Sequence, residues 1–186
     1  MIKRFIALSI LIIIASSSRA TEPSYPIVYS KKGNLHLKKC ESPTDCSFSG
    51  TRTLSGKYEF GIDELCDSGE KDGCVSLVFY PNNTDGLPRF EIRNITYITI
   101  SNYKNAAEQL MGKEFAEKVI SSAQAAIGPG HTRNKTIVAK GTAKILIGDY
   151  KMGIGCDAGY AIAKMLEVKK RSEVTFEEND SLDSSE

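Results

Sequence analysis

Several short stretches of the chain alternate between apolar and polar residues, which is the pattern of half-buried β-strands. In one of them, Tyr58, Phe60 and Ile62 alternate with charged or small residues. Alternation or a high content of β-branched residues predicts strands at 26–30, 34–40, 57–62, 74–80, 90–100, 136–140, 143–154 and 160–169. A strong turn at 81–86 and the other short connections predict that the early strands form an antiparallel meander.

In residues 106–127 the apolar residues recur with the period of a helix. Asn105 can cap its first turn, and the Gly-Pro-Gly segment 128–130 ends it. Gly112 is the weak position, because glycine costs about 1 kcal/mol relative to alanine inside a helix. Apolar residues recur every four positions along one stripe: Ala107, Met111, Phe115, Val119, Ala123 and Ile127. Such a stripe predicts packing on a sheet, and a groove for a partner is the alternative.

Together these elements predict an α+β fold, an antiparallel sheet or sandwich with one long amphipathic helix packed on it. We assign residues 21–171 to a single globular domain. Residues 172–186 contain six acidic residues and neither Lys nor Arg. Because this segment offers little apolar surface to offset the entropy of ordering, it is predicted to be an acidic, disordered tail.

The first twenty residues have the layout of a secretory signal peptide. Lys3 and Arg4 precede an apolar run at 5–15, which is too short to span about 30 Å of hydrocarbon. Ser18 and Ala20 are the small residues that signal peptidase requires before a cut. The sequence therefore predicts a periplasmic or secreted protein that begins at Thr21 and has no transmembrane segment. A short buried helix or an uncleaved anchor is the alternative.

Export would place the five cysteines in an oxidising compartment, where their spacing indicates disulfides. The simplest pairing joins Cys40 to Cys46 and Cys66 to Cys74, and it leaves Cys156 with a free thiol. Other pairings, including one that involves Cys156, remain open at this stage because spacing alone does not fix connectivity.

Composition and motifs exclude several functional classes. With 24 Lys plus Arg against 23 Asp plus Glu, the chain lacks the strong positive charge typical of nucleic-acid binding. The two histidines, His36 and His131, lack metal-ligand spacing, and no Ser or Cys carries a nucleophile signature. The sequence therefore predicts no metal, no cofactor and no recognisable catalytic site. Hydrolysis by a pair of carboxylates stays open, because the two can come from distant positions.

One short stretch combines a dense negative charge with the predicted disulfide between Cys66 and Cys74. Its five carboxylates are Asp63, Glu64, Asp67, Glu70 and Asp72. A closed acidic loop could dock with a basic protein, because a constrained loop loses little entropy on binding and opposite charge speeds association. The alternative is a solvated hairpin tip.

These observations favour an exported, non-enzymatic binding protein, such as an inhibitor or immunity protein that acts on another, basic enzyme. Two alternatives remain. The first is an envelope hydrolase that uses unidentified carboxylates. The second is a structural envelope component or adhesin subunit, which a long, unpaired apolar edge strand would favour.

Overall fold

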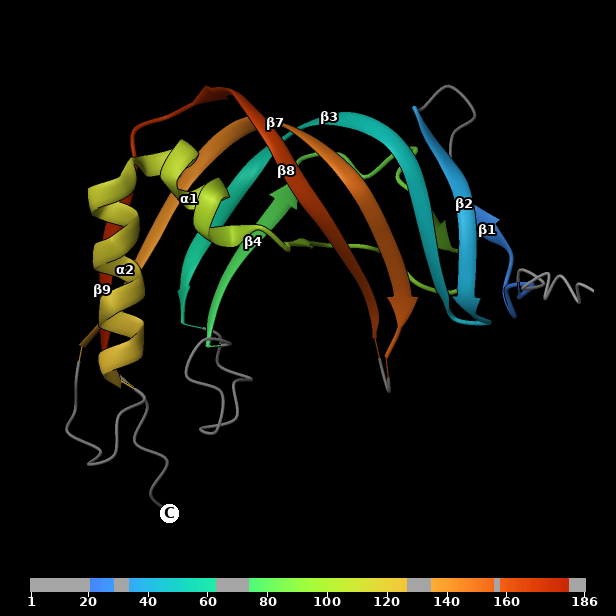
Figure 1. Ribbon diagram of the computed structural model, residues 1–186, viewed down its shortest axis with the longest axis horizontal. Coiled ribbons are helices and arrows are strands. Elements are labelled where there is room, and N and C mark those ends of the chain that lie inside the picture. Colours follow the sequence, from blue (N-terminus) through green and yellow to red (C-terminus); the bar gives the residue numbers. More distant parts are fainter. Residues whose placement is uncertain (1–20, 29–33, 63–73, 127–134, 156–157, 181–186) are drawn as a thin grey trace, which may run out of the picture.

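Two long strands, β3 and β7, run through the molecule and pair with most of its other strands (Figure 1). The computed structural model describes residues 21–28, 34–62, 74–126, 135–155 and 158–180. In chain order its elements are β1 Ile27–Val28, β2 Leu35–Ser42, β3 Asp45–Ile62, β4 Val75–Pro81, β5 Arg89–Phe90, β6 Ile98–Ile100, α1 Tyr103–Met111, α2 Lys113–Ala126, β7 Lys135–Ile154, β8 Gly159–Arg171 and β9 Thr175–Asp180.

The ladders between strands close into a ring. β3 pairs antiparallel with β4 and with β7, β7 pairs antiparallel with β8, and the short β6 joins β4 to β8. β2 adds an edge strand beside the first part of β3, and β9 adds another beside the first part of β7. β9 and the helices therefore lie at one end of the molecule, and β1 and β2 lie at the other (Figure 1).

This architecture corrects the predicted fold class. Among the described residues the chain is mostly β, with a seven-stranded mixed sheet and two short helices instead of one long amphipathic helix. The expected antiparallel order fails where β6 runs parallel to β8. A parallel pair needs a long crossover, and here both helices and β7 supply it. None of the described helices is long and apolar enough to cross a membrane.

Gly112 is the reason that the predicted helix is two helices. Its φ of 89° and ψ of 154° are far from helical values, and they fall in a region that only glycine occupies readily. The first helix also begins earlier than expected, with Asn102 rather than Asn105 at its cap position. The side chain of Asn102 binds both the N–H and the C=O of Met165 in β8 at 2.8 Å, which ties the helix start to the sheet.

The inner face of the sheet and the buried faces of both helices form one hydrophobic core. Its largest fully buried side chains include Phe48, Tyr58, Phe60, Phe79 and Tyr150. The helices contribute small and aliphatic residues, namely Ala106, Ala107, Leu110, Met111, Ala116, Val119 and Ala123. Ile127 of the predicted stripe lies outside the described residues, and Phe115 is the exception among the others. It is 47% exposed and stacks on Phe176 of β9, with ring centroids 5.1 Å apart.

Three strand predictions also need correction. The predicted strands 136–140 and 143–154 are parts of one strand, β7. β3 begins at Asp45, well before the predicted start. The sequence pattern missed the first part of this strand because a register shift between Phe48 and Thr51 interrupts the alternation of its side chains. Within the predicted strand 90–100, only its first residue, in β5, and Ile98–Ile100 of β6 are in strands. The β-branched residues between them lie in a connection.

β9 occupies part of the segment that was predicted to be disordered. Its six residues pair along β7 from Lys140 to Lys135, so the prediction of disorder is corrected for Thr175–Asp180. The prediction from composition was wrong here because β9 needs no hydrophobic core of its own to become ordered. It fills the edge of β7 that β8 leaves open, and it anchors Phe176 against α2.

Replacing Gly112 with alanine tests the break between the helices. A continuous helix would gain about 1 kcal/mol from this change. In the observed conformation the positive φ makes alanine strained although no atom crowds the position, so we expect a loss of about 1–3 kcal/mol in unfolding free energy. Urea denaturation measures the change. Ser121→Ala on the exposed face of α2 is the control and should change stability by less than about 0.5 kcal/mol. A more stable Gly112→Ala variant would contradict the break.

Candidate functional site

The predicted docking loop is bordered by two strands that the structure describes. β3 ends at Ile62, which pairs with Val75 at the start of β4, so the loop connects the two strands of a hairpin. The loop residues Asp63, Glu64, Asp67, Glu70 and Asp72 lie outside the described residues, and so does Cys66. Their role as a docking loop therefore stays a prediction.

The cysteines among the described residues all form disulfides. Cys40 and Cys46 form a disulfide between directly paired residues of β2 and β3. Cys74 is buried and disulfide-bonded, with a partner outside the described residues. The pairing of Cys74 with Cys66 and the free thiol of Cys156 stay predictions, because Cys66 and Cys156 both lie outside the described residues.

The strand topology brings the two points where the acidic segments leave the sheet to the same end of the sheet. Ala139 of β7 pairs with Phe60 of β3 on one side and with Phe176 of β9 on the other. β3 and β9 therefore run in the same direction beside β7, separated by two strand spacings, or about 10 Å. The acidic loop follows the end of β3, and the acidic C-terminal residues follow the end of β9. We call this end of the sheet, with Glu59, Glu177, Glu178 and the two segments that leave it, the acidic end.

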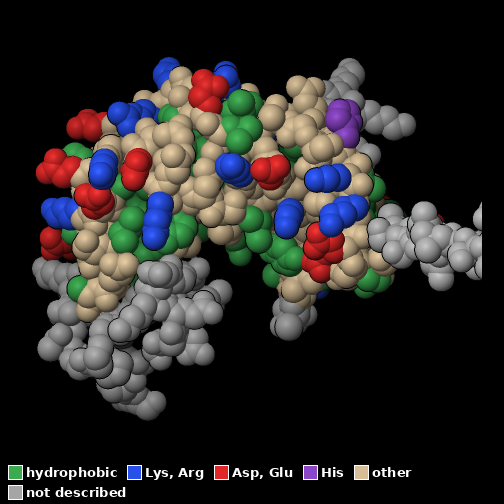
Figure 2. All heavy atoms as spheres, viewed as in Figure 1, with side chains coloured by type: hydrophobic (Ala, Val, Ile, Leu, Met, Phe, Trp, Pro, Cys, Tyr) green, Lys and Arg blue, Asp and Glu red, His purple; other side chains and the backbone are tan. Residues whose placement is uncertain are grey.

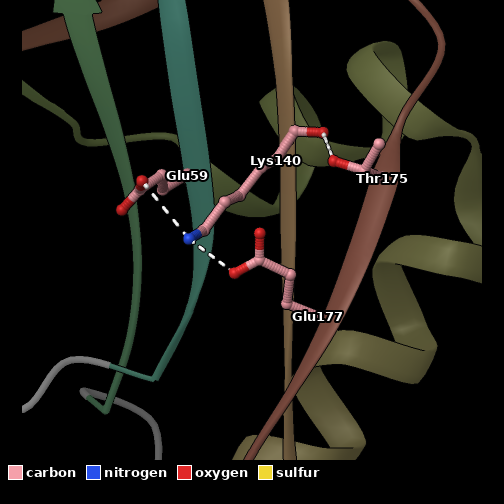
Figure 3. Close-up of polar contacts among 4 residues, drawn as sticks. All are labelled: Glu59, Lys140, Thr175 and Glu177. Carbon is pink, nitrogen blue, oxygen red and sulfur yellow. Dashed lines mark hydrogen bonds and ion pairs between the residues drawn. The ribbon is translucent and has the colours of Figure 1, made fainter.

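An ion-pair cluster on the outer face holds β9 in this position (Figure 3). The ammonium of Lys140 lies between two carboxylates, 2.7 Å from Glu177 of β9 and 3.8 Å from Glu59 of β3. The hydroxyl of Thr175 donates to the carbonyl of Lys140 at 3.3 Å. The bond to Glu177 and the charge of Glu59 raise the pKa of Lys140, so it stays charged.

This cluster is suited to structure rather than to catalysis. Its side chains are one-third to one-half exposed, so each pair contributes at most about 1 kcal/mol. One lysine between two carboxylates leaves a net charge of −1 on this part of the acidic end. Beside it, burial and the charge of Glu59 raise the pKa of Tyr80, which keeps its phenol protonated.

A second polar cluster lies on the outer face at the other end of the sheet. Asp45, Gly153 and Tyr160 are paired in register across β3, β7 and β8. The Tyr160 hydroxyl donates to the Asp45 carboxylate above Gly153, where a Cβ would collide with both groups. Ser42 donates a further hydrogen bond to Asp45 at 2.7 Å. Glycine in the central strand is therefore required for this contact.

These bonds move the two pKa values apart. The hydrogen bond from Tyr160, aided by that from Ser42, lowers the pKa of Asp45. Burial and the bond to Asp45 raise the pKa of Tyr160 to about 12. Near neutral pH, Asp45 is a weak base and Tyr160 a weak acid. Such a pair is poorly matched to general acid–base catalysis, which works best with pKa values near the operating pH.

The Asp45 cluster borders a hollow of about 330 Å³. Glu41 lines it as well, but its carboxylate is 2.9 Å from the ammonium of Lys39, and this bond lowers the pKa of Glu41. Lys151 and Ser47 complete its polar lining. In the part of the chain that the structure describes, no three His, Cys, Asp or Glu side chains are grouped closely enough to hold a metal ion.

Sequence reasoning missed the Asp45 cluster because its partners are 115 residues apart. Only the register of β3, β7 and β8 reveals the role of Gly153. On the face shown in Figure 2, basic and acidic side chains are interspersed, so this face does not show one continuous patch of either sign.

Comparison with known proteins adds no further assignment. No protein-family model, no curated protein and no solved structure matches this chain.

Removing the Tyr160 hydroxyl tests the Asp45 cluster. In Tyr160→Phe the pKa of Asp45 should rise towards its ordinary value of about 3.9, which NMR titration of the carboxyl carbon measures. Because the folded-state pKa of Asp45 is lowered, its stabilising effect is complete above about pH 5 and is lost as the pH falls through that lowered value. The variant should therefore be less stable than the wild type at neutral pH, and the difference should shrink in acid.

Tyr25→Phe, at an exposed tyrosine, is the control and should leave the Asp45 titration unchanged. If Asp45 titrates identically in the wild type and in Tyr160→Phe, the two side chains are not bonded in solution.

Proposed function

We propose that this protein is an exported, non-enzymatic binding protein whose acidic end docks with a basic protein, as an inhibitor or immunity protein does with an enzyme. The observation that carries the proposal is the pairing of β9 with β7. Through it, the acidic C-terminal segment begins within about 10 Å of the strand that leads into the acidic loop. Two acidic segments that are distant in sequence can then act on one partner surface.

The charge arrangement supports docking in physical terms. Carboxylates gathered at one end create a field that steers a basic partner and raises its association rate. Lys140 offsets Glu59 and Glu177 only in part, so the described strands add to the negative charge of the segments they carry.

The alternatives receive less support from the described residues. A carboxylate hydrolase needs one carboxyl group with a raised pKa, but the resolved shifts of Glu41 and Asp45 are both downward. An assembly subunit would favour a regular apolar edge strand. The edge strand β2 instead has exposed Lys38 and Lys39 and two irregularities in its pairing, which are features that prevent edge-to-edge association.

Neutralising the loop tests the proposal. The test variant is Asp67→Asn, Glu70→Gln and Asp72→Asn, and the control variant is Glu22→Gln, Glu91→Gln and Asp149→Asn, at exposed carboxylates elsewhere. Both remove three charges. Partners captured from an envelope extract by the wild type and retained by the control should be lost by the test variant. With a purified partner, the test variant should associate about tenfold more slowly at low salt.

Salt dependence separates docking from other effects. The difference in association rate should largely vanish near 1 M salt, where the Debye length is about 3 Å. Unfolding free energy should change by less than about 0.5 kcal/mol in either variant. Equal binding by the wild type and the test variant would contradict docking through the loop. Loss of folding in the test variant alone would show that these carboxylates serve the fold.

A further inference from the structure

A basic hollow of about 360 Å³ lies on the sheet where β3, β7 and β8 run side by side. Among the described residues, its charged lining residues are Lys144, Lys170 and Arg171, and no Asp or Glu lines it. Ser55, Asn82, Thr142 and Ser172 are its polar, uncharged lining residues, and Gly56 and Ala143 complete the lining. The lysines and the neighbouring hydroxyls supply positive charge and hydrogen-bond donors, which suit an anion.

The two lysines of the hollow lie opposite each other on neighbouring strands, where their positive charges repel. Lys144 of β7 pairs directly with Lys170 of β8 in the ladder, and Ser55 of β3 pairs with Lys144 on the other side. Like charges directly opposite each other on neighbouring strands destabilise a sheet. Neither lysine forms an ion pair with a described residue. The nearby carboxylate of Glu167 bonds instead to Lys169, at 3.1 Å.

Arg171 is fixed at the edge of this hollow by the helix next to it. Its guanidinium donates to the carbonyls of Gln109 and Leu110 at 2.8 and 2.7 Å, where α1 ends. These carbonyls lack partners within the helix and carry its negative dipole end, so they hold the arginine well. Arg171 therefore adds positive charge near the hollow, while its guanidinium stays bonded to the helix end.

We propose that this hollow binds a phosphate- or sulfate-type oxyanion, either free or as part of an anionic headgroup. A tetrahedral oxyanion has enough acceptor oxygens to bridge Lys144 and Lys170 and to reach a neighbouring hydroxyl. It would turn the repulsion between the two lysines into a shared attraction. The site uses none of the residues of the acidic end, so it does not depend on the proposed docking function.

The experiment compares Lys144→Gln/Lys170→Gln with the control Lys38→Gln/Lys118→Gln. Both variants lose two positive charges, and both control lysines are exposed and distant in the sequence from the hollow. The probes are inorganic phosphate, titrated against sodium chloride of equal ionic strength, and vesicles of phosphatidylglycerol or phosphatidylcholine. The readouts are amide chemical shifts around Ser55 and Lys144, the melting temperature, and vesicle co-sedimentation.

Phosphate should shift these amides saturably and raise the melting temperature of the wild type and the control. Affinity should fall at least about tenfold in Lys144→Gln/Lys170→Gln, which loses two charged hydrogen-bond donors. Without anions, this variant should be at least as stable as the wild type, because the repulsion is gone. That result also shows that it folds.

The two probes separate the sources of the anion. Binding to phosphatidylglycerol vesicles without a response to phosphate would identify a headgroup, and a response to phosphate would show that the free ion is sufficient. The proposal is overturned if neither probe binds, or if the control loses as much affinity as the test variant. A clearly less stable Lys144→Gln/Lys170→Gln variant in the absence of anions would also overturn it.

Discussion

The ladder between β3 and β7 is the interaction on which the rest of the structure depends. It runs from the pair Asp45–Gly153 to the pair Phe60–Ala139, and each of the two strands carries further strands on its other edge. Because side chains alternate between the faces of a strand, this register sends one set into the core and the other onto the outer face. A slip by one residue would exchange the two sets and dismantle both polar clusters and the core together.

Each candidate site described above depends on the register of the strands that pair with β7. The Asp45–Tyr160 bond forms because Gly153 separates their strands, and the basic hollow forms because Lys144 is placed opposite Lys170. At the far end, Lys140 links β3 to β9 across the same central strand. The result is a sheet with a basic hollow where β3, β7 and β8 run side by side, and the strands that lead into the two acidic segments end at one end of it. The proposals assign an oxyanion to the first and a basic protein to the second.

Local patterns predicted much of the fold, and they failed where distant contacts decide the outcome. Alternation located the cores of β4 and β8, and spacing paired Cys40 with Cys46. By contrast, the helix stripe continues through Gly112 without a gap, so the sequence period does not reveal the break. The candidate sites were less predictable still, because their residues come from strands that meet only in the folded sheet.

β9 shows this limit most clearly and supports the functional account. Its composition is that of a disordered tail, yet it pairs along β7, stacks Phe176 on Phe115 and binds Lys140 through Glu177. Amide hydrogen exchange of residues 175–180 tests this most directly. The account predicts that amides bonded to β7 exchange at least about tenfold more slowly than the same residues in an isolated peptide. Exchange at the rate of the isolated peptide would mean that the strand is not formed, and it would remove the basis for one shared acidic end.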